Sequence, residues 1–463
     1  MMTSGWIIVL DIGKSFSKAS LWNEALHCVA QRARANLRLE LAGRLTLDYL
    51  GIEGWLREVL SEFAKMGPVF AIVPVAHGAA MTLIGNGRLL EAPLDYEWAG
   101  VAAQRASYDL QRDPFLATGS PALPAGLNLG LQLHWLESIG SSGAAAGQIV
   151  PWAQYWAWVL SGVPAAEVTS LGCHSDLWRP FDHGPSQLAE RRGWAERLAP
   201  LTNAGAVLGT VQPRWVDATG LSPNVEVYCG LHDSNAALLN ARSHPELEGR
   251  DATILSTGTW FVAMRTPVGS PDHSAVELPE ARDCLLNVDV AGTPIPSARF
   301  MGGREIELLA GSDASLHSDA AYSAAITAIK TGDMIVPSYT PGVGPYPFAP
   351  LRQPAPISPR DAAMAKAHLY AALLADASLD LIGSRDTVVV DGRFSRAPIF
   401  VQALANLRPT TRIVVSSDDH GVAHGALQLV RQGRHEPLKI VSPLAVDMSA
   451  YRARWRDAAE HAS

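Results

Sequence analysis

The sequence predicts an α/β protein built from two domains of similar design. Its 463 residues exceed what one simple hydrophobic core usually organises. Short runs rich in Val and Ile alternate with longer segments in which apolar residues recur every three or four positions. Hydrophobic residues make up 48% of the chain and charged residues 18%, which indicates a folded globular protein. Alternating strands and helices predict sheets that are covered by helices.

The strand-like segments are short and each is bounded by Gly, Asp or Ser, as is typical of buried strands. They lie at 6–11, 16–22, 69–75, 226–231, 253–257, 260–264, 387–391 and 412–416. Helices are predicted at 51–66 and 359–382, and the second begins at a Pro, which suits a first helical turn. The aromatic stretch 152–163 is too short to span a membrane, so we expect a buried helix there.

Two kinds of element occur twice, in the same order. The segments 7–22 and 253–264 are each a strand, a polar Gly turn and a second strand. The segments 226–241 and 412–430 are each a strand, a loop bearing Asp and His, and an Ala/Leu helix. This repetition predicts two related domains, at 1–242 and 243–463, joined by a polar crossover at 240–251.

The charge and cysteine content indicate the environment and partners of the protein. A net charge of −8 favours small-molecule partners and argues against bulk nucleic-acid binding. The four cysteines show no C-x-x-C spacing and are expected to be reduced thiols of a cytoplasmic protein. The N-terminus has no basic segment ahead of its apolar run, so neither a signal peptide nor a membrane partner is expected. Exposed Trp surfaces could support a homodimer.

Two strand–turn–strand segments have the composition of phosphate-binding turns. In "DIGKSFSK" a strand ends at Asp11, and the turn that follows can direct backbone N–H groups at phosphate oxygens, while the carboxylate can hold a hydrated Mg²⁺. "LSTGTW" offers a second turn of the same kind. Taken alone, the first turn is better explained as a plain hairpin that uses Asp and Gly for their backbone freedom. Two such turns on two repeats favour a nucleotide polyphosphate.

The ordered set of motifs resembles the FGGY carbohydrate kinase family. The set comprises "DIGKS", "PVAHGAAMTLI", "TSLGCHSDLW", "GLHDSNAAL", "LSTGTW", "FMGGREIE", "VVVDGRFSRAPIFVQALANL" and "HGVAHGAL", and it covers nearly the whole chain. The His-Asp form of the central motif is most similar to the rhamnulokinase and fuculokinase branch. The resemblance implies an actin-like fold of two ribonuclease-H-like domains, with sugar and MgATP in the cleft between them.

The resemblance also implies roles for individual residues. Asp233 would be the catalytic base, and Asp11 would organise Mg²⁺ through water. The first phosphate loop would be Gly13, Lys14 and Ser15, and the second Thr257, Gly258 and Thr259. The adenosine segment would contain Gly392, Phe394 and Ser395, with Gly421 and Gly425 nearby in the second connecting motif. The sugar side would involve His77, Gly78, Tyr96, Asp176 and His232.

Several of these positions have a structural interpretation as well. Asp233 could cap the helix that follows it, and His77 could be an internally satisfied histidine at a strand end. Asp95, Tyr96 and Trp98 could form a structural turn instead of a sugar site, and Asp176 with Trp178 could belong to a domain core. Arg304 could contact substrate or pair with an acid.

Two residue patterns resemble functional sites but are not interpreted as such. His420 and His424 have metal-ligand spacing, but Gly421 disfavours a helix there and no matched third ligand is apparent. The contiguous "HDS" at 232–234 cannot form a hydrolase triad, which needs residues that converge in space.

The leading hypothesis is an ATP-dependent kinase of a ketose such as L-rhamnulose, L-fuculose or a related pentulose. A non-catalytic sugar or nucleotide sensor on the same fold, a kinase of another polyol, and an actin- or chaperone-like ATPase are the alternatives. The adenosine segment "DGRFSRAP" lacks the family's richer glycine run, and Lys14 replaces a small hydroxyl residue. These departures leave the choice of phosphate donor open.

Overall fold

The structure is a computed structural model that describes residues 5–269, 277–311, 318–340, 342–354, 357, 359–418, 420–433 and 437–461. The chain divides into two compact units. Unit 1 comprises the chain up to Asn240, the stretch Leu286–Pro294 and a segment that begins at Val422. Unit 2 comprises Ala241–Leu285, Ile295–Gly421 and the C-terminal segment. The main boundary thus falls two residues before the predicted 242/243, and a single boundary does not represent the two later returns to unit 1.

Unit 1 is organised by a mixed sheet in the order β12-β13-β6-β1-β2-β3, with β14 also paired to β6. β1 runs parallel to β6 and antiparallel to β2. The strands are β1 (Trp6–Ile12), β2 (Phe16–Trp22), β3 (Cys28–Ala35), β6 (Val69–Ala76), β12 (Val207–Thr210), β13 (Glu226–Tyr228) and β14 (Leu231–His232).

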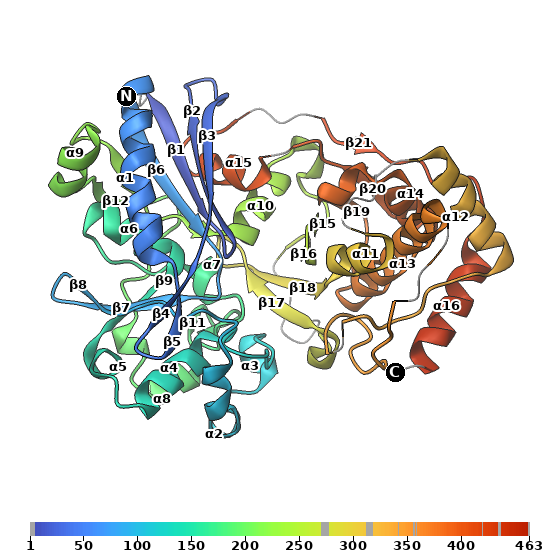
Figure 1. The fold of residues 1–463 in the computed structure, drawn as a ribbon, viewed down its shortest axis with the longest axis horizontal. Coiled ribbons are helices and arrows are strands. Elements are labelled where there is room, and N and C mark those ends of the chain that lie inside the picture. The colour runs from blue at the N-terminus through green and yellow to red at the C-terminus, as the bar shows by residue number, and fades with distance from the viewer. Residues whose placement is uncertain are drawn as a thin grey trace. The chain divides into compact units, whose positions relative to one another are not determined.

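Helices cover both faces of this sheet, as Figure 1 shows: α1 (Tyr49–Met66) and α6 (Trp152–Ser161) on one, α10 (Asp233–Arg242) and α15 (Gly421–Gln428) on the other. Along β1, Ile8 and Leu10 join the core that contains α1 and α6, whereas Ile7 and Val9 join the core that contains α10 and α15. Because both faces are buried, the strand is an unbroken apolar run.

A smaller layer of unit 1 has its own core around Leu83, Leu131 and Trp194. Its sheet is β8 (Arg88–Glu91), β7 (Met81–Gly85) and β9 (Gln148–Pro151), and its helices include α4 (Leu129–Ser138) and α8 (Gln187–Arg191). The remaining elements of unit 1 are β4 (Arg38–Leu41), β5 (Arg44–Leu47), α2 (Arg105–Asp109), α3 (Phe115–Thr118), α5 (Ser142–Ala146), α7 (Val168–Leu171), β10 (Trp178–Arg179), β11 (Gly184–Pro185) and α9 (Pro213–Thr219).

The sheet of unit 2 repeats the design of unit 1. Its order is β17-β18-β16-β15-β19-β20-β21. The path β18-β16-β15-β19-β20-β21 matches β3-β2-β1-β6-β13-β12 in order and in the direction of each pairing, so the predicted repeat is confirmed. The strands are β15 (Ala252–Thr257), β16 (Phe261–Thr266), β17 (Cys284–Val288), β18 (Pro294–Phe300), β19 (Thr387–Gly392), β20 (Arg412–Val415) and β21 (Lys439–Ile440).

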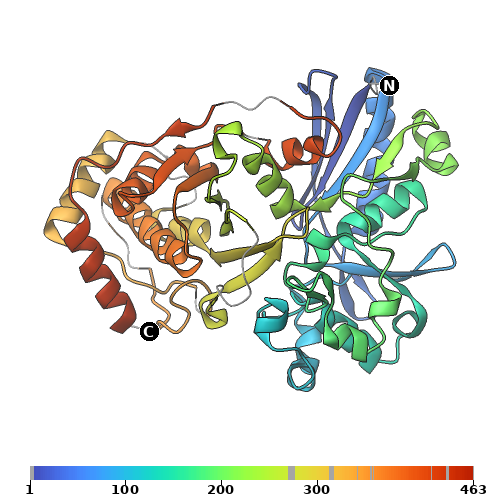
Figure 2. The same ribbon diagram turned by 180° about the vertical axis from the view of Figure 1, so that it is seen from behind.

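The helices of unit 2 pack around α13 (Arg360–Leu381), which is Ala-rich and buried along most of its length. Its neighbours are α11 (Gly302–Ala310), α12 (Asp319–Thr331) and α14 (Pro398–Leu407). The C-terminal helix α16 (Ser449–His461), red beside the C label in Figure 2, is tied to α13 by ion pairs. Arg452 and Arg456 lie 2.7 and 2.6 Å from the buried carboxylate of Asp376.

The predicted strands and helices are observed, with two differences. The helix α15 begins at Gly421, where the glycine was expected to disfavour a helix. The predicted strand 226–231 is divided into β13 and β14. Gly230 between them has φ +74°, and a Cβ there would lie 1.9 Å from the Pro74 carbonyl oxygen. Only glycine allows this bend against β6. The bend lets Leu231 and His232 pair with β6 again.

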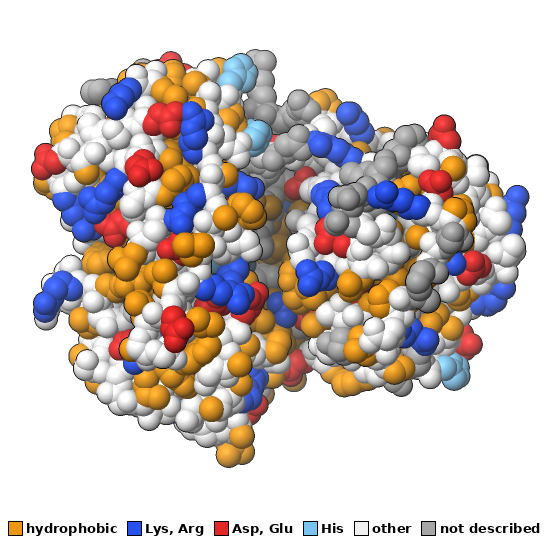
Figure 3. Space-filling model, in the orientation of Figure 1, with side chains coloured by type: hydrophobic (Ala, Val, Ile, Leu, Met, Phe, Trp, Pro, Cys, Tyr) orange, Lys and Arg blue, Asp and Glu red, His pale blue; other side chains and the backbone are white. Residues whose placement is uncertain are grey.

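The surface gives no support to the proposed tryptophan-based dimer. All 13 tryptophans lie in the described residues, and each is buried or half-buried. Figure 3 shows basic and acidic side chains interspersed over the visible face, without a large area of one sign.

The stretch 152–163 forms the buried helix α6, as predicted. In the described part of the chain, no helix is long and apolar enough to cross a membrane.

Candidate functional site

Three parallel strands of unit 1 end together, and their ends carry the predicted acceptor residues. β1 is in register with β6, pairing Ile12 with Ala76, and β14 pairs His232 with the same residue. Asp11 therefore lies near the end of β1, His77 directly after β6, and His232 at the end of β14. The carboxyl edge of a parallel sheet is where α/β proteins place their sites. Residues separated by more than 200 positions converge there.

Asp233 is the first residue of α10, and its two carboxylate oxygens have different surroundings. Oδ1 accepts hydrogen bonds from the Ser234 amide at 2.6 Å and the Ser234 hydroxyl at 3.3 Å, and it lies 3.2 Å from Nε2 of His232. Oδ2 has no partner among the described residues. A helix cap would instead accept from an amide two or three residues ahead. The carboxylate is therefore held at one oxygen and available at the other.

Asp11 is a second carboxylate close to Asp233. Burial and, to a lesser extent, the charge of Asp233 raise the pKa of Asp11 to about 6 against the opposing charge of Lys18. A pair of carboxylates of this kind suits a hydrated Mg²⁺, which keeps several waters and needs only one or two protein oxygens. Within the described ranges no group of three or more His, Cys, Asp or Glu residues forms a fully protein-built metal cage.

His77 has two buried ring nitrogens, and neither has a hydrogen-bond partner among the described residues. Burial lowers its pKa to about 4, so the ring is neutral at physiological pH. Its ring packs against Tyr96 at a centroid distance of 5.4 Å and Trp152 at 6.5 Å. A neutral imidazole offers one donor and one acceptor, and leaving both unsatisfied in a buried site is costly. A hydroxyl group both accepts and donates, so it is the kind of ligand group that complements such a ring.

Lys14 is directed toward the aromatic side of this cluster. Its ammonium donates to Asp95, which is fully buried, and lies 4.3 Å from the centre of the Tyr96 ring. Arg38 is a second partner, with its Nε 3.1 Å from Asp95 Oδ2. Burial lowers the pKa of Lys14. Sequence reasoning missed this network because its members are brought together only by folding.

The turn at 13–15 is shaped by Asn36. The Asn36 amide donates to the Ser15 carbonyl at 2.8 Å, and its side-chain Nδ2 donates to the Gly13 carbonyl at 2.9 Å. Gly13 itself donates to the Phe16 carbonyl at 3.0 Å. These bonds direct the carbonyl groups of Gly13 and Ser15 toward Asn36.

Gly78 and His232 are in contact. A Cβ on Gly78 would lie 2.7 Å from the Cys173 sulfur and 3.1 Å from Nε2 of His232. The glycine therefore lets the chain after β6 pass directly over the His232 ring.

Asp176 is committed to the interior of unit 1. Its carboxylate accepts from the Tyr108 hydroxyl at 2.7 Å and from Nε of Arg112 at 3.2 Å, and it is buried. These contacts correspond to the core alternative for this residue. Trp98 likewise packs edge-on against Trp135 at 4.9 Å.

In unit 2 the turn after β15 is built by close backbone approach. The Gly258 amide donates to the Trp260 carbonyl at 3.0 Å, and a Cβ on Gly303 would lie only 2.0 Å from the Gly258 carbonyl oxygen. Helix α11 thus begins directly against this turn. The Arg304 amide donates to Thr259 at 3.3 Å, while its side chain is exposed and has no ion pair among the described residues.

The predicted adenosine segment follows β19, next to the same turn. Phe394 donates its amide to the Thr257 hydroxyl at 3.1 Å, and its buried ring lies 5.3 Å from that of Phe261. The Ser395 hydroxyl donates to the Gly392 carbonyl at 2.8 Å. Both side chains therefore serve the fold.

Gly425 has a packing role that the sequence did not indicate. A Cβ at this position would lie 1.8 Å from the Ala236 carbonyl oxygen, so α15 packs against the backbone of α10 one turn after Asp233. Gly421 is the first residue of α15. The glycine predicted to lie near the nucleotide thus also supports the helix that carries the predicted base.

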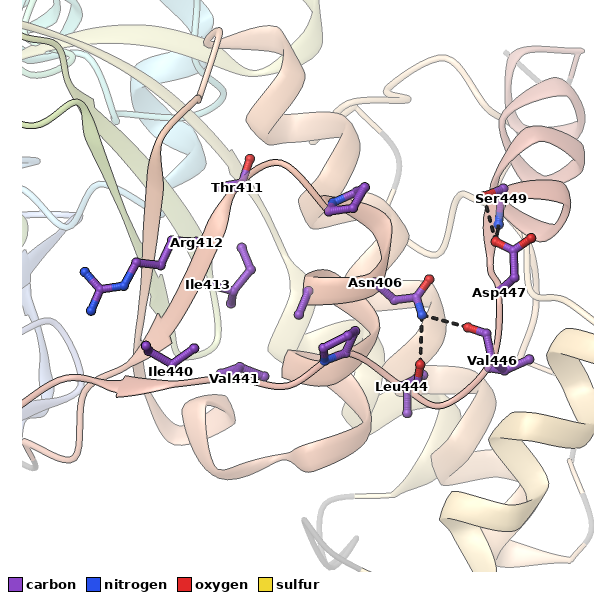
Figure 4. Close-up of a pocket in the computed structure, with 13 residues that line it drawn as sticks. Asn406, Thr411, Arg412, Ile413, Ile440, Val441, Leu444, Val446, Asp447 and Ser449 are labelled. Atoms are coloured by element: carbon purple, nitrogen blue, oxygen red, sulfur yellow. Dashed lines mark hydrogen bonds between the residues drawn. The ribbon is translucent and has the colours of Figure 1, made fainter.

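Unit 2 also contains a cavity of about 590 Å³ between the end of α14, β20, β21 and the chain that leads to Ser449 (Figure 4). Asn406 stabilises one side by donating to the carbonyls of Leu444 at 2.9 Å and Val446 at 2.7 Å. None of the residues predicted for sugar, nucleotide or metal lines this cavity.

Comparisons with known proteins identify the family. Residues 249–437 match the family model described as carbohydrate kinase FGGY, C-terminal domain. The chain is 46% identical to a carbohydrate kinase from Novosphingobium aromaticivorans over 99% of both chains, with a TM-score of 0.92. A xylulose kinase from Rhodospirillum rubrum (18% identity, 98% of this chain and 97% of that one, TM-score 0.77) shares the fold. So does an ADP-bound glycerol kinase from Plasmodium falciparum (13%, 99% and 98%, TM-score 0.78).

The 46% identity over the full length establishes the relationship, and it implies ATP as the phosphoryl donor. The chain belongs to the FGGY carbohydrate kinase family, has its two-domain actin-like fold, and is a sugar kinase.

Proposed function

We propose that this kinase transfers the γ-phosphoryl group of ATP to a hydroxyl of a ketose, with Asp233 as the general base. The observation that supports this best is the difference between the two carboxylate oxygens of Asp233. Oδ1 accepts hydrogen bonds from Ser234 and lies 3.2 Å from Nε2 of His232, and Oδ2 has no partner among the described residues. A base must be fixed in position and must also keep one oxygen for the substrate.

In the proposed reaction the sugar hydroxyl oxygen attacks the γ-phosphorus. The new O–P bond forms, the bond from phosphorus to the β,γ-bridging oxygen breaks, and ADP leaves with the electron pair of that bond. Asp233 Oδ2 accepts the hydroxyl proton. Phosphoryl transfer of this kind depends on positioning and charge neutralisation, which is why a single fixed carboxylate suffices as the proton acceptor.

The sugar is proposed to lie beside His77. Its two unpartnered ring nitrogens suit adjacent hydroxyls, and Tyr96 offers a ring face next to it. Lys14 and Arg38 form ion pairs with both Asp95 and Glu97, so two cations and two anions balance charge on this side, which favours an uncharged sugar. Gly78 and His232 complete this proposed sugar side. Asp176 is left out because its carboxylate is occupied by Tyr108 and Arg112.

The phosphates of ATP are proposed to be bound by the turns at 13–15 and 257–259, and adenosine by the backbone around Gly392. Asp11 is the proposed holder of a hydrated Mg²⁺, because its buried carboxylate feels the charge of Asp233, and a hydrated ion needs only one or two protein oxygens. When bound, the ion would neutralise charge on the phosphates.

The finer substrate choice rests on the central "GLHDSNAAL" motif, which resembles the rhamnulokinase and fuculokinase branch. We therefore propose the terminal primary hydroxyl of L-rhamnulose, L-fuculose or a related pentulose as the acceptor. A cytoplasmic location follows from the same proposal, since ATP and phosphorylated sugars are cytoplasmic metabolites.

The test is ADP release with MgATP over a panel of ketoses and polyols, repeated with Asp233→Asn. We expect a 6-deoxyketohexose or a related pentulose to give the highest kcat/KM, and the variant to lose on the order of 100-fold or more of kcat. Turnover that is highest with glycerol or gluconate would refute the proposed ketose substrate. Full sugar-dependent turnover by the variant would refute the role of Asp233.

A further inference from the structure

We propose that Asn235 and His232 form a hydrogen-bond relay that positions the base, with Asn235 setting which nitrogen of the His232 ring carries the proton. In this relay His232 donates to Asp233, and Asn235 donates to His232. Both are positioning residues for phosphoryl transfer. The inference rests on the proposed role of Asp233 as the base.

The relay is contained in one helical turn and one strand end. His232 closes β14, and Asn235 lies three residues later in the first turn of α10. Nδ1 of His232 is 3.2 Å from Nδ2 of Asn235, and Nε2 is 3.2 Å from Oδ1 of Asp233. All three side chains are thus connected in sequence, and both His232 and Asn235 are buried.

The His232 ring is fixed from two further directions. Its backbone amide donates to the hydroxyl of Thr169 at 3.0 Å. Gly78 lies against the ring so closely that a Cβ would be 3.1 Å from Nε2. The ring therefore has little freedom to turn away, and the protonation of its two nitrogens decides what it offers to Asp233.

Hydrogen-bond chemistry selects one tautomer. A carboxylate only accepts, so a favourable contact with Oδ1 of Asp233 requires a proton on Nε2. Burial lowers the pKa of His232, which keeps the ring neutral, so Nδ1 must then carry a lone pair. That lone pair accepts from Nδ2 of Asn235. The opposite tautomer would direct a lone pair at the carboxylate, and the two would repel.

For catalysis, the relay fixes the orientation of the Asp233 carboxylate. Three donors converge on Oδ1 of Asp233: the Ser234 amide, the Ser234 hydroxyl and the His232 ring. They hold the carboxylate in one orientation and leave Oδ2 to accept the proton of the sugar hydroxyl. Asn235 contacts none of the reacting atoms, yet it determines whether the third donor exists.

Substitutions can separate this relay from simple packing. Asn235→Asp presents only acceptor oxygens to Nδ1, so in a ring that burial keeps neutral the single proton moves to Nδ1 and the donor to Asp233 is lost. His232→Gln places an amide Nε2–H where the imidazole Nε2–H was and has no tautomers, so it keeps the donor without needing Asn235. Asn240→Asp is the matched control, because it introduces the same charge at another buried position of the same helix.

We expect Asn235→Asp to lower kcat by on the order of 10- to 100-fold, with the sugar KM changed by less than about threefold. In the His232→Gln background the same substitution should cost less than about threefold, and Asn240→Asp should retain most of the wild-type kcat. Equal losses from Asn235→Asp in both backgrounds would overturn the relay. Equal losses from Asn235→Asp and Asn240→Asp would also overturn it, because buried charge alone would then explain the effect.

A spectroscopic readout makes the test independent of activity. With ¹⁵N-labelled histidine, the His232 ring is assigned by its loss in His232→Gln, and two-bond couplings report which nitrogen is protonated. The relay predicts Nε2–H in the wild type and a proton on Nδ1 in Asn235→Asp. Nδ1–H in the wild type would disprove it. If Asp233→Asn keeps full turnover, the base assignment fails, while the tautomer result still stands or falls on its own.

Discussion

Charged and polar side chains near the proposed sugar side have partners from distant parts of the chain. Asp95 is fully buried and is held by Lys14 and Arg38, which come from the β1–β2 turn and from β4. A buried carboxylate that loses a cationic partner keeps its desolvation cost without the compensating attraction. Lys14 is therefore a stabilising residue in addition to any role in substrate binding.

Lys14→Met removes the ammonium and keeps much of the side-chain volume. We expect it to lower the free energy of unfolding by about 2 kcal/mol, less than for a fully buried pair because Arg38 remains beside Asp95. The double variant Lys14→Met/Asp95→Asn should recover most of that loss, since the uncompensated charge is gone. Urea unfolding measures both. Additive losses in the double variant would show that Lys14 and Asp95 do not depend on each other.

At the scale of elements, the position of Asp233 depends on the packing of α10 against α15. Gly425 allows this packing, because its missing side chain admits the Ala236 carbonyl. Unfilled or overfilled contacts of this kind change helix positions by tenths of an ångström or more, and catalysis is sensitive to such changes.

Gly425→Ala places a methyl group 1.8 Å from the Ala236 carbonyl oxygen, so one helix must move. We expect a loss of about 2 kcal/mol in stability and a kcat lowered by at least 10-fold. Gly54→Ala in α1 is the control, because a Cβ there meets nothing within 4 Å and alanine favours the helix. Thermal melts and steady-state kinetics of the two variants provide the comparison. Wild-type kcat in Gly425→Ala would contradict the packing argument.

At the scale of the whole molecule, each unit contains a buried titratable group. The two groups change stability with pH in opposite directions. In unit 1, burial raises the pKa of Glu167 to about 7, although amides of α7 and the Thr169 hydroxyl donate to it. In unit 2, burial lowers the pKa of His368 to about 4. Both groups prefer the neutral form in the folded protein, so each destabilises its unit where the unfolded chain would ionise it.

The pH dependence of stability should therefore differ between the units. Glu167 has a folded pKa above its unfolded value of 4.5, so its unit loses stability as the pH rises from 4.5 to about 7. His368 has a folded pKa below 6.5, so its unit loses stability as the pH falls from 6.5 to about 4. Each full change corresponds to about 3 kcal/mol.

Urea unfolding of Glu167→Gln and His368→Leu at several pH values tests this. Relative to the wild type, Glu167→Gln should gain stability as the pH is raised from 5 to about 7.5, and His368→Leu as it is lowered from 7 to about 4.5. Curves that stay parallel to the wild type over these ranges would show that neither group titrates as the burial implies.

Much of the fold was readable from local patterns. β2 spans the predicted 16–22, α13 lies within the predicted 359–382, and the repeated strand order matches the repeat seen in the sequence. These features follow from periodicity in apolar residues, which is a local property. The family and the sugar kinase activity also follow from motifs that keep their order along the chain.

The environment of each site residue was decided only by tertiary structure. The charge of Asp233 raises the pKa of Asp11, which lies 222 positions earlier, and Gly425 packs against Ala236, nearly 190 positions away. Local sequence determines which strands and helices can form, because periodicity and turn chemistry act over a few residues. Burial and charge partners join residues distant in sequence, so only the folded chain determines which acids and histidines share one edge of the sheet.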